Sequence, residues 1–222
     1  MSMKKRGFTL GEVLITLSVV GMVAILTIPS LTGDIAAKHR MAKLTNTIGD
    51  LNNAVQLYMM RERVSVIDST NEDFQDELKK LMKTKDGYAS LYTYGSIRNP
   101  AVNNNFFNIH FGTHGFILEN GVHIKICGYN GLTDRFYVAI DVNGADKPNI
   151  IGLDMFIATL YKQDIQNDDG DVVVHAGDIG MDIAEDEENL LENCTSGDLN
   201  NHLAACYSLA EQKGFAPDYY KE

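Results

Sequence analysis

The sequence contains few of the residue patterns that mark an enzyme. It has no Ser-His-Asp order in a recognisable context, no glycine-rich phosphate-binding loop and no paired Cys/His spacing for zinc. Acidic residues outnumber basic ones, with 30 Asp and Glu against 19 Lys and Arg, so the formal net charge is −11. No Lys or Arg occurs between Lys162 and Lys213. Such an acidic chain repels nucleic acid, and beyond the N-terminal leader only 38–40 and 79–85 are locally basic. We therefore expect neither catalysis nor nucleic-acid binding.

Cysteine is also rare, with three residues in the chain. The N-terminal segment described below predicts that the domain is exported, and in an exported domain three cysteines predict one disulfide and one remaining thiol. Cys194 and Cys206 flank a short segment that ends in a helical pattern, so we pair them. Cys127 lies in a strand-like apolar run and is interpreted as a buried small side chain. A bridge from Cys127 to either of the other two is the open alternative.

One long apolar segment dominates the N-terminal part of the chain. From 8 to 28 the only charged residue is Glu12, and a helix of this length spans about 30 Å, the thickness of a bilayer's hydrocarbon core. The leader before it carries Lys4, Lys5 and Arg6, and basic flanks stay on the cytoplasmic side of a membrane. The pattern therefore predicts a single-pass membrane protein whose C-terminal domain lies outside the cytoplasm.

Glu12 is unusual in this segment, because a carboxylate in an apolar layer is costly and is usually paired and functional. The next basic residue downstream is Lys38. Cleavage after Gly7 would supply a nearer partner, since Phe8 would then carry a free α-ammonium. Phe8 and Glu12 are four residues apart and share one face of a helix, whose N-terminus itself favours an anion.

The leader, Gly7, Phe8-Thr9-Leu10 and the run from Glu12 to Leu17 resemble the class III signal of type IV prepilins and type II secretion pseudopilins. This resemblance implies cleavage between Gly7 and Phe8 and N-methylation of Phe8. It also implies that Glu12 neutralises the N-terminal amine of a neighbouring subunit in a filament. Pro29 stands where the family has a helix-disrupting proline, whereas Gly11 departs from the larger apolar residue or Ala that is common there. The resemblance covers residues 1–60 closely and the rest only loosely.

The same resemblance implies a structural subunit of a type IV pilus or type II secretion pseudopilus, which is a helical homo-oligomeric filament. Its expected partners are the prepilin peptidase, the membrane, and an inner-membrane assembly platform with its ATPase. The precursor is expected in the inner membrane, and the filament in the periplasm or on the cell surface. The alternative function is a membrane-anchored exported binding or enzyme domain that does not polymerise.

The expected fold is α+β and pilin-like, with a long N-terminal helix packed on an antiparallel β-sheet and a short C-terminal helix. We divide the chain into a leader (1–7), a transmembrane and filament-core segment (8–31), an amphipathic continuation of the helix (32–62) and a globular domain (63–222). Pro29 and Gly33 predict a kink or softening of the helix. Beyond it, apolar residues at steps of three and four predict one buried stripe: Met41, Leu44, Ile48, Leu51, Val55 and Tyr58.

The later chain predicts an antiparallel meander and two more helices. Short apolar runs between turn signals predict strands at 106–111, 115–119, 122–127, 136–142, 155–161 and 172–175. Asn120-Gly121 predicts a tight hairpin, and the acidic turn at 168–170 is expected to join the last two strands. Helices are expected at 71–83 and from Ser196 or Asp198 to Gly214.

One loop combines several oxygen-bearing side chains: Asp141, Asn143, Asp146 and Asp154. Its pattern resembles a loop of pilin-like and pseudopilin-like proteins. The aspartates can accept backbone N–H bonds and hold the loop closed, or they can converge on Ca²⁺. The spacing does not match the helix-loop-helix calcium pattern, so we favour a structural loop and expect no cofactor or metal. The acidic stretches at 168–171 and 185–188 are interpreted as a solvated face, with a cation site as the alternative.

Overall fold

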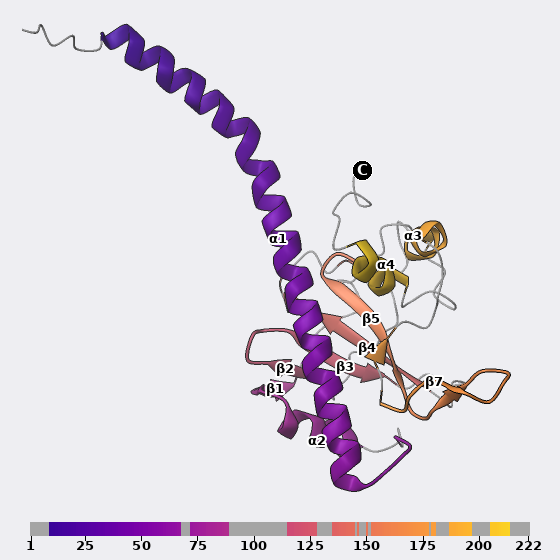
Figure 1. Ribbon diagram of the computed structural model, residues 1–222. Helices are drawn as coiled ribbons and strands as arrows, with labels where there is room; N and C mark the ends of the chain where they lie inside the picture. Colours follow the sequence, from indigo (N-terminus) through magenta and orange to yellow (C-terminus); the bar gives the residue numbers. More distant parts are fainter. Residues whose placement is uncertain are drawn as a thin grey trace, which may run out of the picture.

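A computed structural model describes residues 9–67, 72–88, 115–127, 135–144, 146, 150, 152–177, 179–180, 187–196 and 205–213. These residues form one long helix, a six-stranded antiparallel sheet, a separate two-stranded ribbon and three shorter helices (Figure 1). The predicted α+β class with an antiparallel sheet is therefore confirmed. Gly7 and Phe8, on which the expected cleavage and methylation fall, lie outside the described residues.

Helix α1 (Leu10–Glu62) is 53 residues long and has defined ends. It begins with a capping box, in which Thr9 Oγ1 accepts a hydrogen bond from Glu12 N at 3.2 Å and Glu12 Oε2 accepts one from Thr9 N at 2.8 Å. It ends where Arg63 takes a left-handed conformation with φ 55°. Pro29 lies inside this single helix, which curves along its length in Figure 1 without being interrupted.

Among the described residues, no helix is both long and apolar enough to cross a membrane. The membrane-spanning segment predicted at 8–31 is therefore wrong, and so is the single-pass inner-membrane location inferred from it. The first half of helix α1 contains one carboxylate, that of Glu12, and hydroxyl side chains at Thr16, Ser18 and Thr27. From Lys38 onward the same helix is amphipathic, with charged and amide side chains on its outward face.

The second half of α1 packs on the sheet through one stripe. Its buried members recur at helical spacing: Ala37, Leu44, Ile48, Leu51, Ala54 and Val55. Met41 and Tyr58 are partly buried and pack against the same cluster, so the predicted stripe is confirmed. Each large apolar side chain buried in this way stabilises the fold by about 1.5–3 kcal/mol.

Helix α2 (Glu72–Leu81) packs beside the C-terminal end of α1. Phe74 is buried, and its ring meets Tyr58 of α1 edge-on with 4.9 Å between ring centroids. The same ring stacks at 6.3 Å on Phe136 of the sheet. Aromatic pairs at such distances add to the burial term, so Phe74 ties α2 to both of its neighbours.

The main sheet has six strands in the order β1-β2-β3-β4-β5-β8, and every neighbouring pair is antiparallel. The strands are β1 (Thr84–Tyr88), β2 (Phe116–Leu118), β3 (His123–Cys127), β4 (Arg135–Asp141), β5 (Met155–Tyr161) and β8 (Ile179–Gly180). Strands β2 to β5 are neighbours in both sequence and space, as the short connections predicted. The edge strands β1 and β8 were not predicted, and the strand expected at 106–111 lies outside the described residues.

Strands β4 and β5 are covered on both faces. Alternate residues face the α1 cluster: Phe136, Val138, Ile140, Phe156, Ala158 and Leu160. The residues between them, including Ala139, Met155 and Ile157, pack against α3 (Glu187–Ser196) and α4 (Ala205–Lys213). Two covered faces explain why β5 is buried at every position instead of alternating between buried and exposed.

A disulfide joins Cys194 of α3 to Cys206 of α4, with 4.7 Å between their Cα atoms. This is the pair that the sequence analysis favoured. A closed loop of this length contributes about 3 kcal/mol, mostly by restricting the unfolded chain. Cys127 lies in β3, away in sequence from this pair.

Strands β6 (Ile165–Gln166) and β7 (Val172–Val174) form a separate two-stranded ribbon. The ribbon projects from the rest of the described chain (Figure 1). The acidic turn at 168–170 joins β6 to β7, whereas the sequence analysis expected it to join the strand at 155–161 to the one at 172–175. The β5 strand pairs instead with β4 and β8.

Candidate functional site

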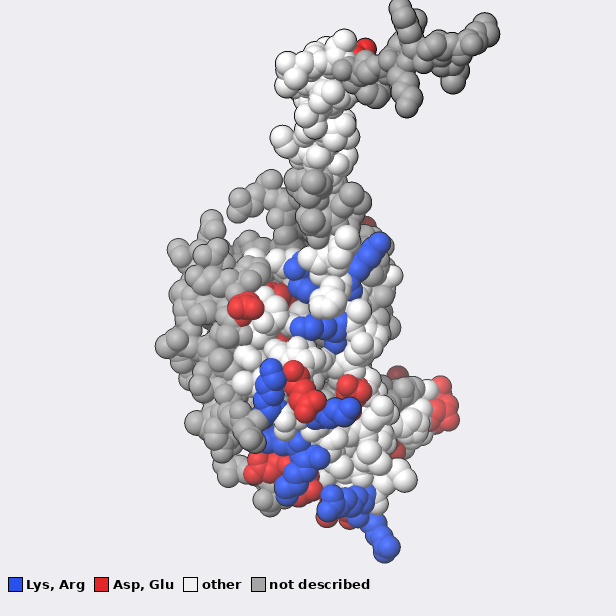
Figure 2. Space-filling view, turned by 90° about the vertical axis from the view of Figure 1, so that its left-hand side faces the viewer, with Lys and Arg blue, Asp and Glu red and all other residues white. Residues whose placement is uncertain are grey.

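The first half of α1 exposes apolar side chains on all of its sides. Ten large apolar residues are each between 44% and 82% exposed: Leu10, Val13, Leu14, Ile15, Leu17, Val19, Val20, Met22, Val23 and Ile25. Soluble monomers rarely leave a contiguous apolar surface of this kind uncovered, and such surfaces mark sites of association. In Figure 2 Lys and Arg gather on the globular part below and not on this half of the helix.

The hydroxyl side chains in this half turn back on the helix itself. Thr16 Oγ1 donates to the carbonyl oxygen of Val13 at 2.9 Å, and Ser18 Oγ donates to that of Leu14 at 2.8 Å. Thr27 Oγ1 makes the same kind of bond to its own preceding turn. Because these donors are satisfied internally, the helix can present a mainly apolar surface to a partner without leaving hydroxyl groups unpaired.

Glu12 lies in the first turn of α1. Its Oε2 atom accepts hydrogen bonds from Thr9 N at 2.8 Å and from Thr9 Oγ1 at 2.9 Å. The backbone bond first, and the side-chain bond second, lower the pKa of Glu12 below its usual value. The carboxylate is therefore ionised near neutral pH.

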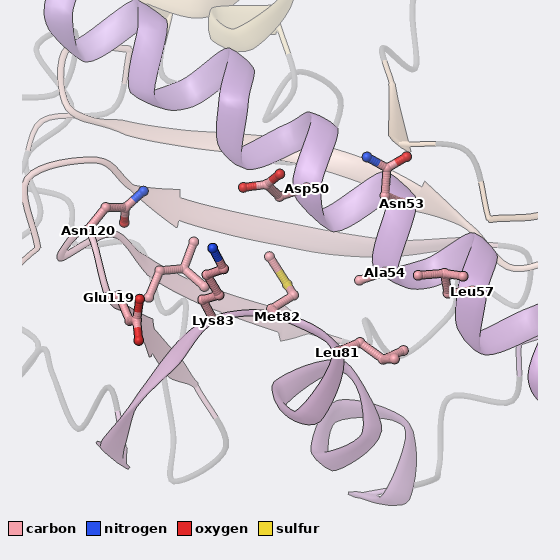
Figure 3. Close-up of a pocket in the computed structure, with 10 residues that line it drawn as sticks. Asp50, Asn53, Ala54, Leu57, Leu81, Met82, Lys83, Glu119 and Asn120 are labelled. Carbon is pink, nitrogen blue, oxygen red and sulfur yellow. The ribbon is translucent and has the colours of Figure 1, made fainter.

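A shallow pocket of about 370 Å³ lies between α1, the end of α2 and the β2–β3 turn (Figure 3). Its apolar lining includes Leu57, Leu81 and Met82, and its charged lining residues are Asp50, Lys83 and Glu119. The sequence offers one signal for this pocket, because Leu57 is a large apolar residue of α1 that lies off the predicted buried stripe.

The aspartates of the predicted loop act as backbone acceptors. Asp141 Oδ1 accepts from the N–H groups of Asn143 at 3.1 Å and Gly144 at 2.9 Å, and Asp154 Oδ1 accepts from Ile150 N at 2.6 Å. Both aspartates are fully buried. A side chain at Gly144 is excluded, since a Cβ there would lie 2.7 Å from the carbonyl oxygen of residue 121.

The same four loop residues do not form a metal centre in the described structure. Asn143 Nδ2 donates to the carbonyl oxygen of Asp146 at 3.0 Å, and the Asp146 side chain is exposed. No group of three or more His, Cys, Asp or Glu residues within the described ranges could hold a metal ion. The hydrogen bonds of Asp141 and Asp154 are those of a structural loop, which is the interpretation that the sequence favoured.

His123 is a buried titratable residue on β3, opposite Asp141 in the register of β4. It is 6% exposed, and its Nδ1 atom is buried without a hydrogen-bond partner among the described residues. Burial lowers the pKa of His123, and the positive charge of Lys85 lowers it further. The folded state therefore favours the neutral imidazole.

We expect the free energy of unfolding to fall as the pH is lowered below about 6.5, the usual histidine pKa. Since the pKa of His123 is lower in the folded state, the unfolded chain binds more protons in the interval between the two values. The contribution of His123 is complete above the unfolded pKa and is lost as the pH falls toward the folded pKa, by at most about 1.4 kcal/mol per pH unit.

Urea unfolding at a series of pH values measures this effect, with His123→Asn as the variant that removes it. Carboxylates elsewhere also titrate, so the informative quantity is the difference in slope between the two proteins. Equal slopes for the parent and His123→Asn would contradict the assignment.

Comparison of the chain with models of known families, with curated proteins and with solved structures finds no match. Function is therefore inferred from the residues of the chain itself.

Proposed function

We propose that this chain is the structural subunit of a helical filament of the type IV pilus or type II secretion pseudopilus kind. In this proposal the chain is cleaved between Gly7 and Phe8 by a prepilin peptidase, and Phe8 is N-methylated. The first half of α1 then packs against the same segment of other copies in the filament core. The globular part, meaning α1 from Ala37 onward with α2, the sheets, α3 and α4, forms the outer layer.

The observation that supports this proposal most strongly is the exposed apolar half of α1. It extends away from the globular part, and no described residue of the same chain covers its ten large apolar side chains (Figure 1). Burying such side chains against other copies stabilises an assembly by about 25 cal/mol per Å² of apolar surface, before the cost of association is subtracted. A homo-oligomer can supply that cover along the whole length of the segment.

Glu12 adds a second line of support. The proposed cleavage creates a positive amine at Phe8, and the Glu12 carboxylate is the one acid between 8 and 28. In an apolar core an unpaired charge is strongly disfavoured, whereas an ion pair is compensated. A copy that is shifted along the axis would leave both groups unpaired, so the pair would set the register between neighbours. The resemblance of residues 7–17 to the prepilin signal supports the same role.

Mass spectrometry of the mature N-terminus tests the proposal. When the full chain is produced in a host with an active prepilin peptidase, we expect the mature protein to begin at N-methylated Phe8. Gly7→Ala is the matched variant, because an added methyl group should obstruct cleavage at this position while leaving the described fold untouched. An intact Met1 in the presence of the active peptidase, or a mature start near Lys38, would contradict the proposal.

A further inference from the structure

Three basic residues lie close together where α1 enters the globular part. Lys38, Arg40 and Lys43, which we call the basic collar, follow one another within two turns, and no acidic residue occurs between 35 and 49. Lys38 is exposed and makes no ion pair with a described residue. Lys43 Nζ donates to the carbonyl oxygens of Asn120 and Val142, both at 3.2 Å, which fixes its position beside the β2–β3 turn. Figure 2 shows Lys and Arg side chains at several levels of this face, including the end from which the exposed half of α1 extends.

The turn of the β6–β7 ribbon has the opposite charge. Asp168, Asp169 and Asp171, which we call the acidic tip, are all exposed, and none forms an ion pair with a described residue. Asn167 Oδ1 accepts hydrogen bonds from Asp169 N at 3.1 Å and from Asp171 N at 2.9 Å. Gly170 completes the turn with φ 87°, a conformation that side-chain-bearing residues rarely adopt. The tip is therefore preorganised, which reduces the entropy lost when it docks.

The basic collar and the acidic tip lie at different distances from the exposed half of α1. Figure 1 shows the ribbon projecting from the globular part at a level farther from the exposed half of α1 than residues 38–43. Copies that are parallel and displaced along a common axis can therefore bring the tip of one copy to the level of the collar of the next. The two surfaces are different, so each copy offers one of each and the series of contacts need not close. Such heterologous contacts generate open filaments.

We propose that the acidic tip of one copy docks on the basic collar of the next copy in the filament. This inference rests on the proposed function and names a second contact between the same subunits, outside the apolar core. The chain carries a net charge of −11, so copies repel each other on average. That repulsion is screened beyond about 8 Å at physiological salt, whereas groups in direct contact are screened much less. Local charge complementarity can therefore set the orientation of the globular parts.

The test compares filament yield and cross-linking in cells that process the full chain. The variant Asp168→Asn/Asp169→Asn/Asp171→Asn removes three negative charges without adding bulk. We expect its yield of sedimented filaments to fall about tenfold, because the tip no longer attracts the collar. General charge repulsion predicts a higher filament yield instead, since a less acidic chain should assemble more readily. The direction of the change therefore separates docking from a non-specific effect.

The matched control is Asp50→Asn/Glu62→Gln/Glu188→Gln, which removes the same amount of charge from exposed positions away from the tip. Its yield should not fall. In filaments of the unaltered chain, a zero-length carbodiimide should couple the Lys38 amine to a tip carboxylate and produce covalent dimers. Lys38→Arg keeps the charge but cannot be coupled, so it should preserve yield and abolish the linkage.

Two results would overturn the inference in distinguishable ways. Filaments that form at full yield with the tip variant, and that contain no Lys38-to-tip peptide, would exclude this contact and leave the proposed function standing. An unaltered chain that is cleaved after Gly7 but forms no filaments would exclude the proposed function, and the docking contact with it.

Discussion

Replacement of Glu12 by Ala should leave cleavage after Gly7 intact and reduce filament yield by at least about tenfold. The physical reason is that the α-ammonium of Phe8 would enter an apolar core without a counter-charge. Cleavage itself should continue, because the variant keeps Gly7, Phe8 and the basic leader. Filament yield is measured by sedimentation and immunoblot, and cleavage by the mass of the N-terminal peptide.

Glu12 also caps α1, so the test needs variants that separate capping from charge. Thr9→Ala removes the hydroxyl from the capping box but keeps the carboxylate, and we expect near-normal assembly from it. Glu12→Gln keeps an acceptor for Thr9 N but has no charge, and it should assemble as poorly as Glu12→Ala. Normal yield from Glu12→Gln would show that hydrogen bonding, and not charge pairing, is what the filament requires.

Leu51→Ala should lower the free energy of unfolding by about 2–5 kcal/mol. Leu51 is 0% exposed and lies in the stripe by which α1 packs on the sheet. Truncation removes three buried carbon atoms and leaves a cavity that the surrounding helix and strands fill only in part. Urea or thermal unfolding, followed by circular dichroism, measures the change.

Leu57→Ala is the matched control, because it makes the same truncation on the same helix. Leu57 is 54% exposed and lines the shallow pocket, so we expect a change within about 0.5 kcal/mol of zero. The helix propensity of the two variants is similar, and the difference between them therefore reports packing alone. Similar losses from both would mean that α1 does not pack on the sheet through the stripe that contains Leu51.

The elements that were predicted well are those with a strong local pattern. The period of the apolar residues between Met41 and Tyr58 identified the packed face of α1, and the apolar run at 155–161 coincides with β5. Asn120-Gly121 marked the turn between β2 and β3. In each case the residues that determine the structure lie within a few positions of one another, so the pattern is visible in one dimension.

The elements that were missed depend on distant partners. Strand β1 has the sequence TKDGY, which lacks any apolar alternation, and it is a strand because Thr84 and Lys85 pair with Leu118 and Ile117 of β2. Helix α3 is rich in acidic residues, and it is held by the burial of Leu190 and by the disulfide of Cys194. Leu190 and Cys194 are four residues apart, which was the available signal.

The sequence by itself determined the position of Glu12 in an apolar helix and the buried stripe on the second half of that helix. It also determined the uneven distribution of charge, with basic residues at 38–40 and 79–85 and acidic residues at 168–171 and 185–188. These features are properties of neighbouring residues. Only the tertiary structure decided between the disulfide alternatives, by placing Cys194 and Cys206 with Cα atoms 4.7 Å apart. It also decided that Asp141 and Asp154 bind backbone N–H groups, and that the acidic turn stands on a ribbon of its own. These outcomes depend on which segments meet across the fold, and that is set by the summed packing of the core rather than by local pattern.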